Sequence, residues 1–264
     1  MFIPCEFFDQ DFYTTRHSEC LVTSRDGDKL KVYAFLPFTS LIMKIIGLVA
    51  SPRGENSSTR KLVAAALEGA ACEGASTRIV DMYRLKIGQC KDCGDCFKTG
   101  SCARDDDLSY VLRCMLDSDG IVMGSPAYAS GGVAPGMETF MERMGEAWHC
   151  LLLEGKYGLV ASASRDGGED LAIARMSDFL KACGVMIIGG AGAALQHHGS
   201  MDQGLERARG LGKDLAIAIK MRSRYEDQED VRAAFIEEFR AHIIANRDRW
   251  THDHDYWTKK GWIH

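Results

Sequence analysis

Short apolar runs alternate with stretches of helical periodicity over residues 43–222. The apolar runs have the length of strands, namely Lys44–Ala50, Thr77–Met82, Ile121–Gly124, Tyr157–Ala163 and Val185–Gly189. The stretches between them repeat apolar residues every three or four positions, as a helix with one buried face does, over Ser57–Cys72, Leu108–Leu116, Met137–Trp148, Glu169–Cys183 and Gln203–Arg222. Short buried strands that alternate with helices predict an α/β protein with a doubly wound, parallel, five-stranded sheet.

Residues 1–42 lie outside this pattern and show no helical period, although Lys29–Phe38 has the composition of a strand. Met43 stands where a natural start would be expected. We interpret 1–42 as an N-terminal extension, either a poorly ordered arm or the product of upstream translation, and 43–222 as the central domain.

Residues 223–264 form the second extension. One apolar stripe with a four-residue repeat predicts a helix, through Val231, Phe235, Phe239 and Ile243. An aromatic tail follows, with Trp250, Tyr256, Trp257 and Trp262. The tail is too apolar to remain in solvent, so we expect it to pack on this subunit or on a neighbouring one.

Composition narrows the classes of partner. The net charge of −5 argues against a nucleic-acid partner. The apolar run Leu41–Ala50 is interrupted by Lys44 and is too short to cross a membrane. The N-terminus lacks the basic and apolar regions of a signal peptide. We therefore expect a cytoplasmic, reducing environment, in which clustered cysteines serve metal or redox chemistry rather than disulfides.

Four cysteines gather in thirteen residues, at Cys90, Cys93, Cys96 and Cys102, in a chain with ten cysteines in 264 residues. Positions i, i+3 and i+6 of a helix drift apart by about 60° per step, so this run cannot place three sulfurs on one helical face. We expect residues 84–105 to form a loop that wraps around something, with Gly94 and Gly100 providing the tight backbone turns.

Three states of this cysteine loop fit the spacing. The first three cysteines have the spacing of bacterial iron–sulfur runs, and Cys102 is close enough to complete the same 4Fe–4S cluster. A four-thiolate zinc site uses similar spacings, usually as two separated pairs. Four reduced thiols without a ligand are the third interpretation.

The loop after the first strand offers hydroxyls, one guanidinium and the free N–H groups of a helix N-terminus, at Ser51, Arg53, Ser57, Ser58 and Thr59. It contains neither the glycine pattern of dinucleotide sites nor that of nucleoside triphosphate sites. These groups suit a terminal phosphate monoester such as that of FMN.

Two later strands end in loops with similar qualities. The first has small residues and an aromatic ring suited to a flat ligand, over Pro126, Ala127, Tyr128, Ala129, Ser130 and Gly131. The second is Arg165, Asp166, Gly167 and Gly168. All three loops are expected at the carboxyl edge of the sheet, where open α/β sheets bind ligands.

These motifs together resemble the flavodoxin-like NAD(P)H-dependent FMN reductase superfamily, and within it the iron–sulfur flavoproteins. The resemblance covers residues 43–222 and implies strand order 2-1-3-4-5, bound FMN, and a homodimer or homotetramer in which the cluster lies near the flavin of an adjacent subunit. By the same resemblance Ser51, Arg53, Ser58 and Thr59 hold the phosphate. Ser58 stands where the family often has asparagine.

Our leading hypothesis is a flavin-dependent oxidoreductase that passes electrons between FMN and a 4Fe–4S cluster, with NAD(P)H or reduced ferredoxin as donor. The alternatives are a cluster-free reductase of quinones, nitro compounds or flavins, and a non-enzymatic protein stabilised by zinc. The flavin carries the redox chemistry and no acid–base pair is visible, so we assign no catalytic side chain.

Overall fold

The computed structural model describes residues 23–26, 29–32, 42–128 and 131–264. The chain divides into two units, Met1–Ile42 and Met43–His264. In the first unit β1 (Thr23–Asp26) and β2 (Lys29–Val32) pair antiparallel. The strand expected over Lys29–Phe38 is present in its first four residues, and the remainder lies outside the described residues, as does most of the segment expected to be poorly ordered.

The second unit contains a five-stranded sheet in which all neighbouring strands are parallel. Its order is β4-β3-β5-β6-β7, which is 2-1-3-4-5 when the strands of this unit are counted alone. The strands are β3 (Lys44–Val49), β4 (Ser76–Asp81), β5 (Gly120–Pro126), β6 (Tyr157–Ser164) and β7 (Met186–Ala194). The predicted flavodoxin-like α/β fold and strand order are therefore confirmed. The division at residue 222 stays a prediction.

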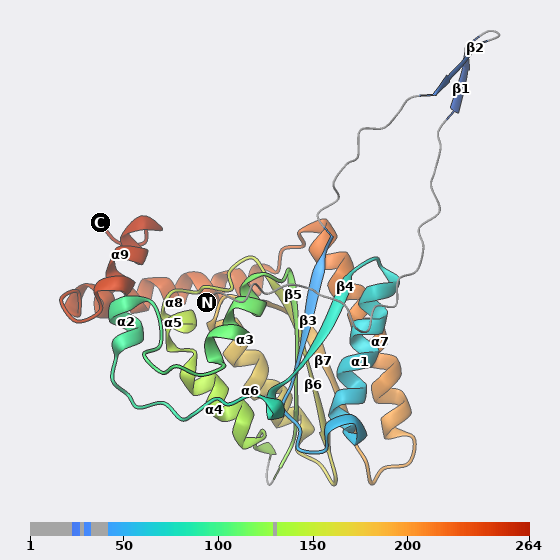
Figure 1. Cartoon of the computed structure of the whole chain (residues 1–264), viewed down its shortest axis with the longest axis horizontal. Helices are drawn as coiled ribbons and strands as arrows, with labels where there is room; N and C mark the ends of the chain where they lie inside the picture. The colour runs from blue at the N-terminus through green and yellow to red at the C-terminus, as the bar shows by residue number, and fades with distance from the viewer. Residues whose placement is uncertain (1–22, 27–28, 33–41, 129–130) are drawn as a thin grey trace. The chain divides into compact units, whose positions relative to one another are not determined.

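Helices cover both faces of the sheet (Figure 1). One face carries α1 (Ser58–Cys72) and α7 (Ser200–Met221), and the other carries α3 (Leu108–Leu116), α4 (Pro135–Arg143) and α6 (Glu169–Ala182). Helices α1 and α7 touch through glycine. A Cβ on Gly212 would lie 1.8 Å from the Ala66 carbonyl oxygen, so only glycine permits this approach.

The helix expected over Met137–Trp148 is two helices, because the chain turns at Met144 between α4 and α5 (Gly145–His149). A Cβ on Gly145 would lie 3.1 Å from the Phe97 ring. The turn and the glycine together leave room for the cysteine loop to pack against this corner.

The C-terminal residues fold back onto the same subunit. Helix α8 (Glu226–Ala245) leads to α9 (Thr251–Lys259), which contacts the short helix α2 (Asp95–Thr99) of the cysteine loop. Trp257 is fully buried in an apolar cluster with Ile243 and Ile263. Among the helices that the structure describes, none is long and apolar enough to cross a membrane.

Candidate functional site

The loop after β3 presents unpaired backbone donors at the start of α1. The Ser57 hydroxyl caps this helix by accepting a hydrogen bond from the Arg60 N–H at 3.1 Å. The N–H groups of Ser58 and Thr59 belong to the first turn, which has no intrahelical acceptor for them. They are therefore available to an anion, which the positive end of the helix dipole also attracts.

The side chains of this loop favour the same ligand. Ser51 and Thr59 are buried, whereas Arg53 is exposed and can swing toward a ligand. The one acidic side chain of the loop, Glu55, is paired with Arg60 at 2.9 Å. Because this pairing offsets the negative charge of Glu55, the loop remains suited to binding a phosphate.

The loop after β5 forms a tight turn. The Tyr128 N–H donates to the Gly132 carbonyl at 2.7 Å, and the Gly131 N–H donates to the Tyr128 carbonyl at 2.8 Å. Gly131 has φ of 89°, and a Cβ there would lie 2.4 Å from the Cβ of Leu171, so glycine is required. Pro126 ends β5, and the Ala127 N–H bonds the Ala163 carbonyl at 3.0 Å. Ala129 and Ser130 lie outside the described residues.

Two exposed tyrosine rings stand at this edge of the sheet. Tyr128 is 45% exposed, and Tyr83, in the short helix η2 (Met82–Arg84) after β4, is 46% exposed. Burial, and then the neighbouring Tyr128, raise the pKa of Tyr83. Exposed aromatic rings at a sheet edge are suited to lie against a flat conjugated ligand. Sequence analysis missed Tyr83, although its position directly after a strand could have indicated it.

The loop after β6 is held open by its own hydrogen bonds. The Ser164 hydroxyl accepts from the Gly167 N–H at 3.0 Å and donates to Glu169 at 2.5 Å. Gly167 and Gly168 have φ of 124° and 91°, which explains the two glycines. Arg165 and Asp166 are exposed, and the Arg165 carbonyl accepts from the Gln196 N–H at 3.0 Å.

The three loops leave adjacent strands at the same edge of the sheet, because β3, β5 and β6 are neighbours and run parallel. The fold thus brings the predicted phosphate loop beside the two loops predicted to line a flat ring. Nothing in the geometry of the described residues conflicts with FMN, since donors, small residues and exposed rings occupy one continuous edge.

The cysteine loop forms a second site. Helix α2 contains Cys96 and lies between Gly94 and Gly100, which have φ of 72° and 75° as the tight turns require. All four cysteines, Cys90, Cys93, Cys96 and Cys102, line one small cavity. The Asp92 N–H lies 3.4 Å from the Cys90 sulfur. Burial, and then the nearby Cys102, raise the pKa of the Cys96 thiol to about 11.

Arg143, at the end of α4, is the residue of this site that sequence analysis missed. Its side chain is 1% exposed, and one guanidinium nitrogen lies 3.1 Å from the Cys102 sulfur. The guanidinium also donates to both carboxylate oxygens of Asp106, at 2.8 and 3.2 Å, and to the Gly88 carbonyl at 2.6 Å. Arg143 lies 41 residues after Cys102. No short-range sequence pattern indicates the contact between Arg143 and Cys102.

The acidic run Asp105–Asp107, directly before α3, binds the start of the cysteine loop. Asp107 is the N-cap residue but makes no side-chain cap, and its carboxylate instead accepts from the Lys86 N–H at 2.6 Å. Asp106 accepts from the Gly88 and Leu108 N–H groups as well as from Arg143. Burial alone would raise the pKa of Asp106, but these hydrogen bonds outweigh it and lower the pKa to about 2. These acids fasten the two ends of the cysteine loop together.

Helix α4 joins the two sites. It begins at Pro135, just after the β5 loop, and ends at Arg143 beside Cys102. Nine residues of α-helix rise about 13 Å, so the two ends of α4 lie about that far apart.

Comparison with known proteins agrees with this geometry. The family model for NADPH-dependent FMN reductase matches residues 43–199. An iron–sulfur flavoprotein of Methanocaldococcus jannaschii is 33% identical, over 68% of this chain and 98% of the relative. An iron–sulfur flavoprotein of Archaeoglobus fulgidus is 31% identical, over 84% of this chain and 100% of the relative.

Solved structures agree on the fold. An NAD(P)H:quinone oxidoreductase from Methanothermobacter marburgensis superposes with a TM-score of 0.53 at 18% identity, over 66% of this chain and 97% of that one. RosB superposes with a TM-score of 0.56 at 15% identity, over 74% of this chain and 87% of that one. The chain therefore belongs to the flavodoxin-like NADPH-dependent FMN reductase family, in its iron–sulfur flavoprotein group, and is an FMN-binding, flavin-dependent oxidoreductase.

Proposed function

We propose that this oxidoreductase passes electrons between FMN at the carboxyl edge of the sheet and a 4Fe–4S cluster held by Cys90, Cys93, Cys96 and Cys102. When bound, FMN exchanges a hydride or single electrons, and the cluster exchanges single electrons. The observation that carries the proposal is that all four cysteines line one cavity against the buried guanidinium of Arg143.

FMN is assigned to the three loops as follows. The phosphate is held by the N–H groups of Ser58 and Thr59, by the hydroxyls of Ser51, Ser57, Ser58 and Thr59, and by Arg53. The flavin ring lies along residues 126–131 and 165–168, with Tyr128 and Tyr83 as aromatic contacts. The buried hydroxyls and the ion-paired Glu55 support this assignment, because they leave the loop without an uncompensated negative charge.

Charge supports a cluster in the cysteine cavity. Four thiolates around an oxidised four-iron cluster leave a net negative charge, and the cavity is lined by three basic residues, Lys91, Arg104 and Arg143, against two acidic ones, Asp92 and Glu142. Hydrogen bonds to the sulfurs tune such clusters, and Arg143 and the Asp92 N–H supply two.

The spacing of the sulfurs favours a cluster over a single zinc ion. Tetrahedral zinc holds its sulfurs at about 2.3 Å and therefore about 3.8 Å from one another. In the described part of the chain, no three of these sulfurs lie within 4.8 Å of one another. A cluster is larger than one ion and accommodates wider spacing. The curated relatives of M. jannaschii and A. fulgidus are themselves named iron–sulfur flavoproteins.

The proposed donor is NAD(P)H or reduced ferredoxin, and the proposed assembly is a homodimer or homotetramer. The cysteine loop leaves β4, which is an edge strand, and then packs beside α9, away from the phosphate loop. Since electron transfer falls steeply with distance, an isologous interface that brings this loop to a neighbour's flavin would shorten the path.

The decisive experiment is a visible spectrum of anaerobically purified protein, before and after dithionite, with iron, acid-labile sulfide and FMN measured per chain. We expect about four irons and four sulfides for each FMN, with broad cluster absorption that bleaches on reduction. Flavin without iron or sulfide would contradict the cluster, and iron without flavin would contradict the assignment of the three loops.

A further inference from the structure

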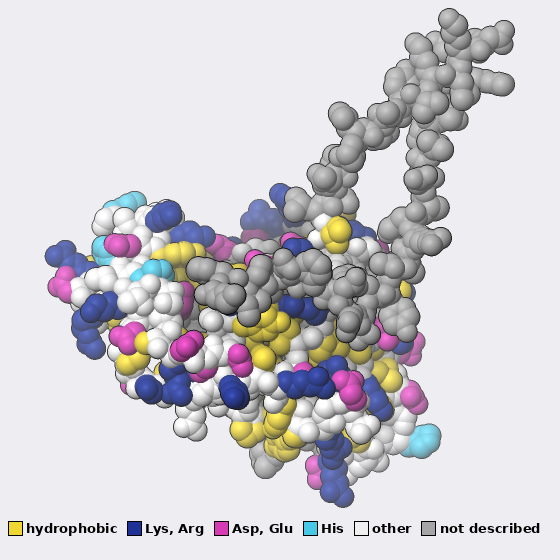
Figure 2. Space-filling view, in the orientation of Figure 1, with side chains coloured by type: hydrophobic (Ala, Val, Ile, Leu, Met, Phe, Trp, Pro, Cys, Tyr) yellow, Lys and Arg dark blue, Asp and Glu magenta, His cyan; other side chains and the backbone are white. Residues whose placement is uncertain are grey.

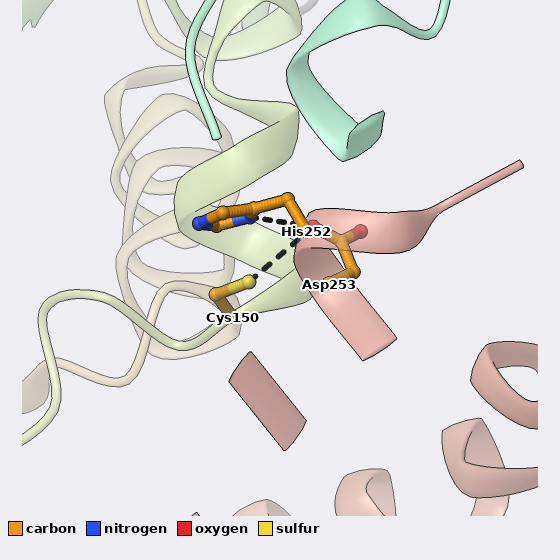
Figure 3. A group of neighbouring side chains, drawn as sticks. All are labelled: Cys150, His252 and Asp253. Atoms are coloured by element: carbon orange, nitrogen blue, oxygen red, sulfur yellow. Dashed lines mark hydrogen bonds and ion pairs between the residues drawn. The ribbon is translucent and has the colours of Figure 1, made fainter. Parts of the chain in front are cut away.

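A second group of metal-ligand side chains lies beside the cysteine loop and uses none of its four cysteines. Cys150 follows α5, and His252 and Asp253 begin α9, so the chain brings them together across about a hundred residues. Figure 3 shows the three side chains converging, with dashed lines from Cys150 and His252 that meet at Asp253. Cys150 and Asp253 are buried, and His252 is half-buried.

Two of the three distances between ligand atoms in this group equal the edges of a zinc tetrahedron. Zinc binds sulfur at about 2.3 Å and nitrogen or oxygen at about 2.0 Å, which places tetrahedral S and O ligands about 3.5 Å apart and N and O ligands about 3.3 Å apart. The Cys150 Sγ lies 3.5 Å from Asp253 Oδ1, and the His252 Nδ1 lies 3.3 Å from the same oxygen. The third pair of ligand atoms lies within 4.8 Å.

The buried carboxylate of Asp253 is held by histidines and a thiol. Asp253 has no exposed surface, and burying a carboxylate without a partner is costly. Within the described residues its partners are two imidazoles and a thiol, with no lysine or arginine bonded to it.

His149 holds the other carboxylate oxygen. Its Nδ1 lies 2.7 Å from Asp253 Oδ2, which leaves Oδ1 facing Cys150 and His252. The His149 ring is itself fixed, stacked on Phe97 at 3.9 Å between ring centres, while its carbonyl accepts from the Trp257 indole at 2.8 Å. Partners of this kind, which orient a metal-binding carboxylate, are typical of built metal sites.

We propose that Cys150 Sγ, His252 Nδ1 and Asp253 Oδ1 bind one zinc ion, with water as the fourth ligand. Binding displaces the thiol proton of Cys150 to solvent, so the bound set is one thiolate, one neutral imidazole and one carboxylate. The ion fastens α9 to the end of α5 next to the cysteine loop. The half-buried side of His252 gives the ion a route from solvent, and Figure 2 shows histidine side chains on the surface of this C-terminal region.

This inference does not rest on the proposed cluster, and its test separates the two. In the full chain, Cys90, Cys93, Cys96 and Cys102 are all changed to serine, and zinc content and zinc affinity are then measured. Cobalt(II) is added in parallel, because tetrahedral cobalt with one thiolate gives strong visible absorption and a thiolate charge-transfer band. We expect one zinc per chain and the tetrahedral, single-thiolate cobalt spectrum.

His252→Ala is the critical variant, because His252 lies at the edge of the site, and far-UV circular dichroism verifies its fold. His254→Ala is the matched control, since His254 lies on the same helix with 30% side-chain exposure against 31% for His252. We expect His252→Ala to weaken zinc binding at least about tenfold and His254→Ala to leave it unchanged. Cys150→Ala should remove the charge-transfer band. Absence of zinc binding in the four-serine protein, or equal affinity in the two histidine variants, would overturn the proposal.

Discussion

The two ends of helix α4 lie beside candidate sites that are built in different ways. At its beginning, the loops after β3, β5 and β6 offer backbone donors, glycine turns and exposed tyrosines, each within a few residues of a strand end. At its end, Arg143 reaches Cys102 and Asp106, and the C-terminal helix α9 covers the far side of the cysteine loop. The first region is local in sequence, and the second is assembled from three distant segments.

This difference predicts how each region responds to substitution. In the proposed flavin region, which comprises the loops after β3, β5 and β6, each loop is fixed by its own turn. A single substitution there should therefore weaken FMN binding and leave the fold intact. In the cysteine region, one buried side chain holds several segments together, so a single change should affect stability and metal content at once.

The largest effect is expected from Arg143→Ala. It leaves Asp106, whose side chain is 12% exposed, without its buried partner, which typically costs about 3–5 kcal/mol of unfolding free energy. Denaturant titration measures the unfolding free energy and metal analysis measures the iron bound per chain. We expect both values to be lower in Arg143→Ala than in wild type.

The matched control for that variant is Arg175→Ala, which removes an exposed pair with Glu138. It should cost less than about 1 kcal/mol. Equal unfolding midpoints for the two variants would show that Arg143 does not hold the cysteine loop.

Arg53→Ala tests the phosphate loop. Loss of a charge-assisted hydrogen bond should weaken FMN binding by about 1.5–3 kcal/mol, as measured by flavin fluorescence titration of the apoprotein. Lys61→Ala removes another exposed cation from the first turns of α1 and should have little effect. Unchanged affinity in Arg53→Ala would place the phosphate elsewhere.

Acid should weaken the cysteine loop through Asp106. The pKa of Asp106 is lowered in the folded protein from its usual 3.8 to about 2, so the stabilisation it provides is complete above the unfolded value and is lost as the pH falls toward 2. The loss amounts to about 2 kcal/mol. The difference in unfolding free energy between wild type and Asp106→Asn should be smaller at pH 3 than at pH 7. The exposed variant Asp105→Asn should have the same unfolding free energy as wild type at both pH values.

Two glycines near the start of α4, Gly131 and Gly136, test whether the β5 loop depends on its turn. Gly131→Ala places a Cβ against Leu171 at positive φ and should cost about 1–3 kcal/mol in folding stability, with weaker FMN binding. Gly136→Ala, in α4 with nothing within 4 Å of its Cβ, should instead stabilise by about 0.4–1 kcal/mol. Thermal unfolding measures the change in melting temperature for each variant. A shift in the same direction for both would contradict the claim that the turn at Gly131 requires glycine.

The fold and the positions of the loops were predictable because they depend on short-range pattern. The apolar strands, the helical periods and the glycines of the cysteine loop all act over a few residues, and their backbone consequences appear in the structure. The turn at Met144 was not predicted, because periodicity continues through it and only the packing of Phe97 against Gly145 explains the break.

Long-range partners were beyond prediction for the same reason. Arg143 and Asp106 lie 37 residues apart, and His149 and Asp253 lie 104 residues apart. Two carboxylates of the Asp105–Asp107 run likewise bind groups that are distant in sequence, since Asp107 accepts from the Lys86 N–H and Asp106 from Arg143.

The central claim is that FMN and the cluster occupy separate sites at opposite ends of α4. The most direct test is to measure iron and FMN together in a Cys93→Ala, Cys96→Ala double variant, with exposed Cys72→Ala as the control. We predict that the double variant loses its iron and keeps one FMN per chain, while the control keeps both. Loss of flavin and iron together in a protein that remains folded would contradict the account.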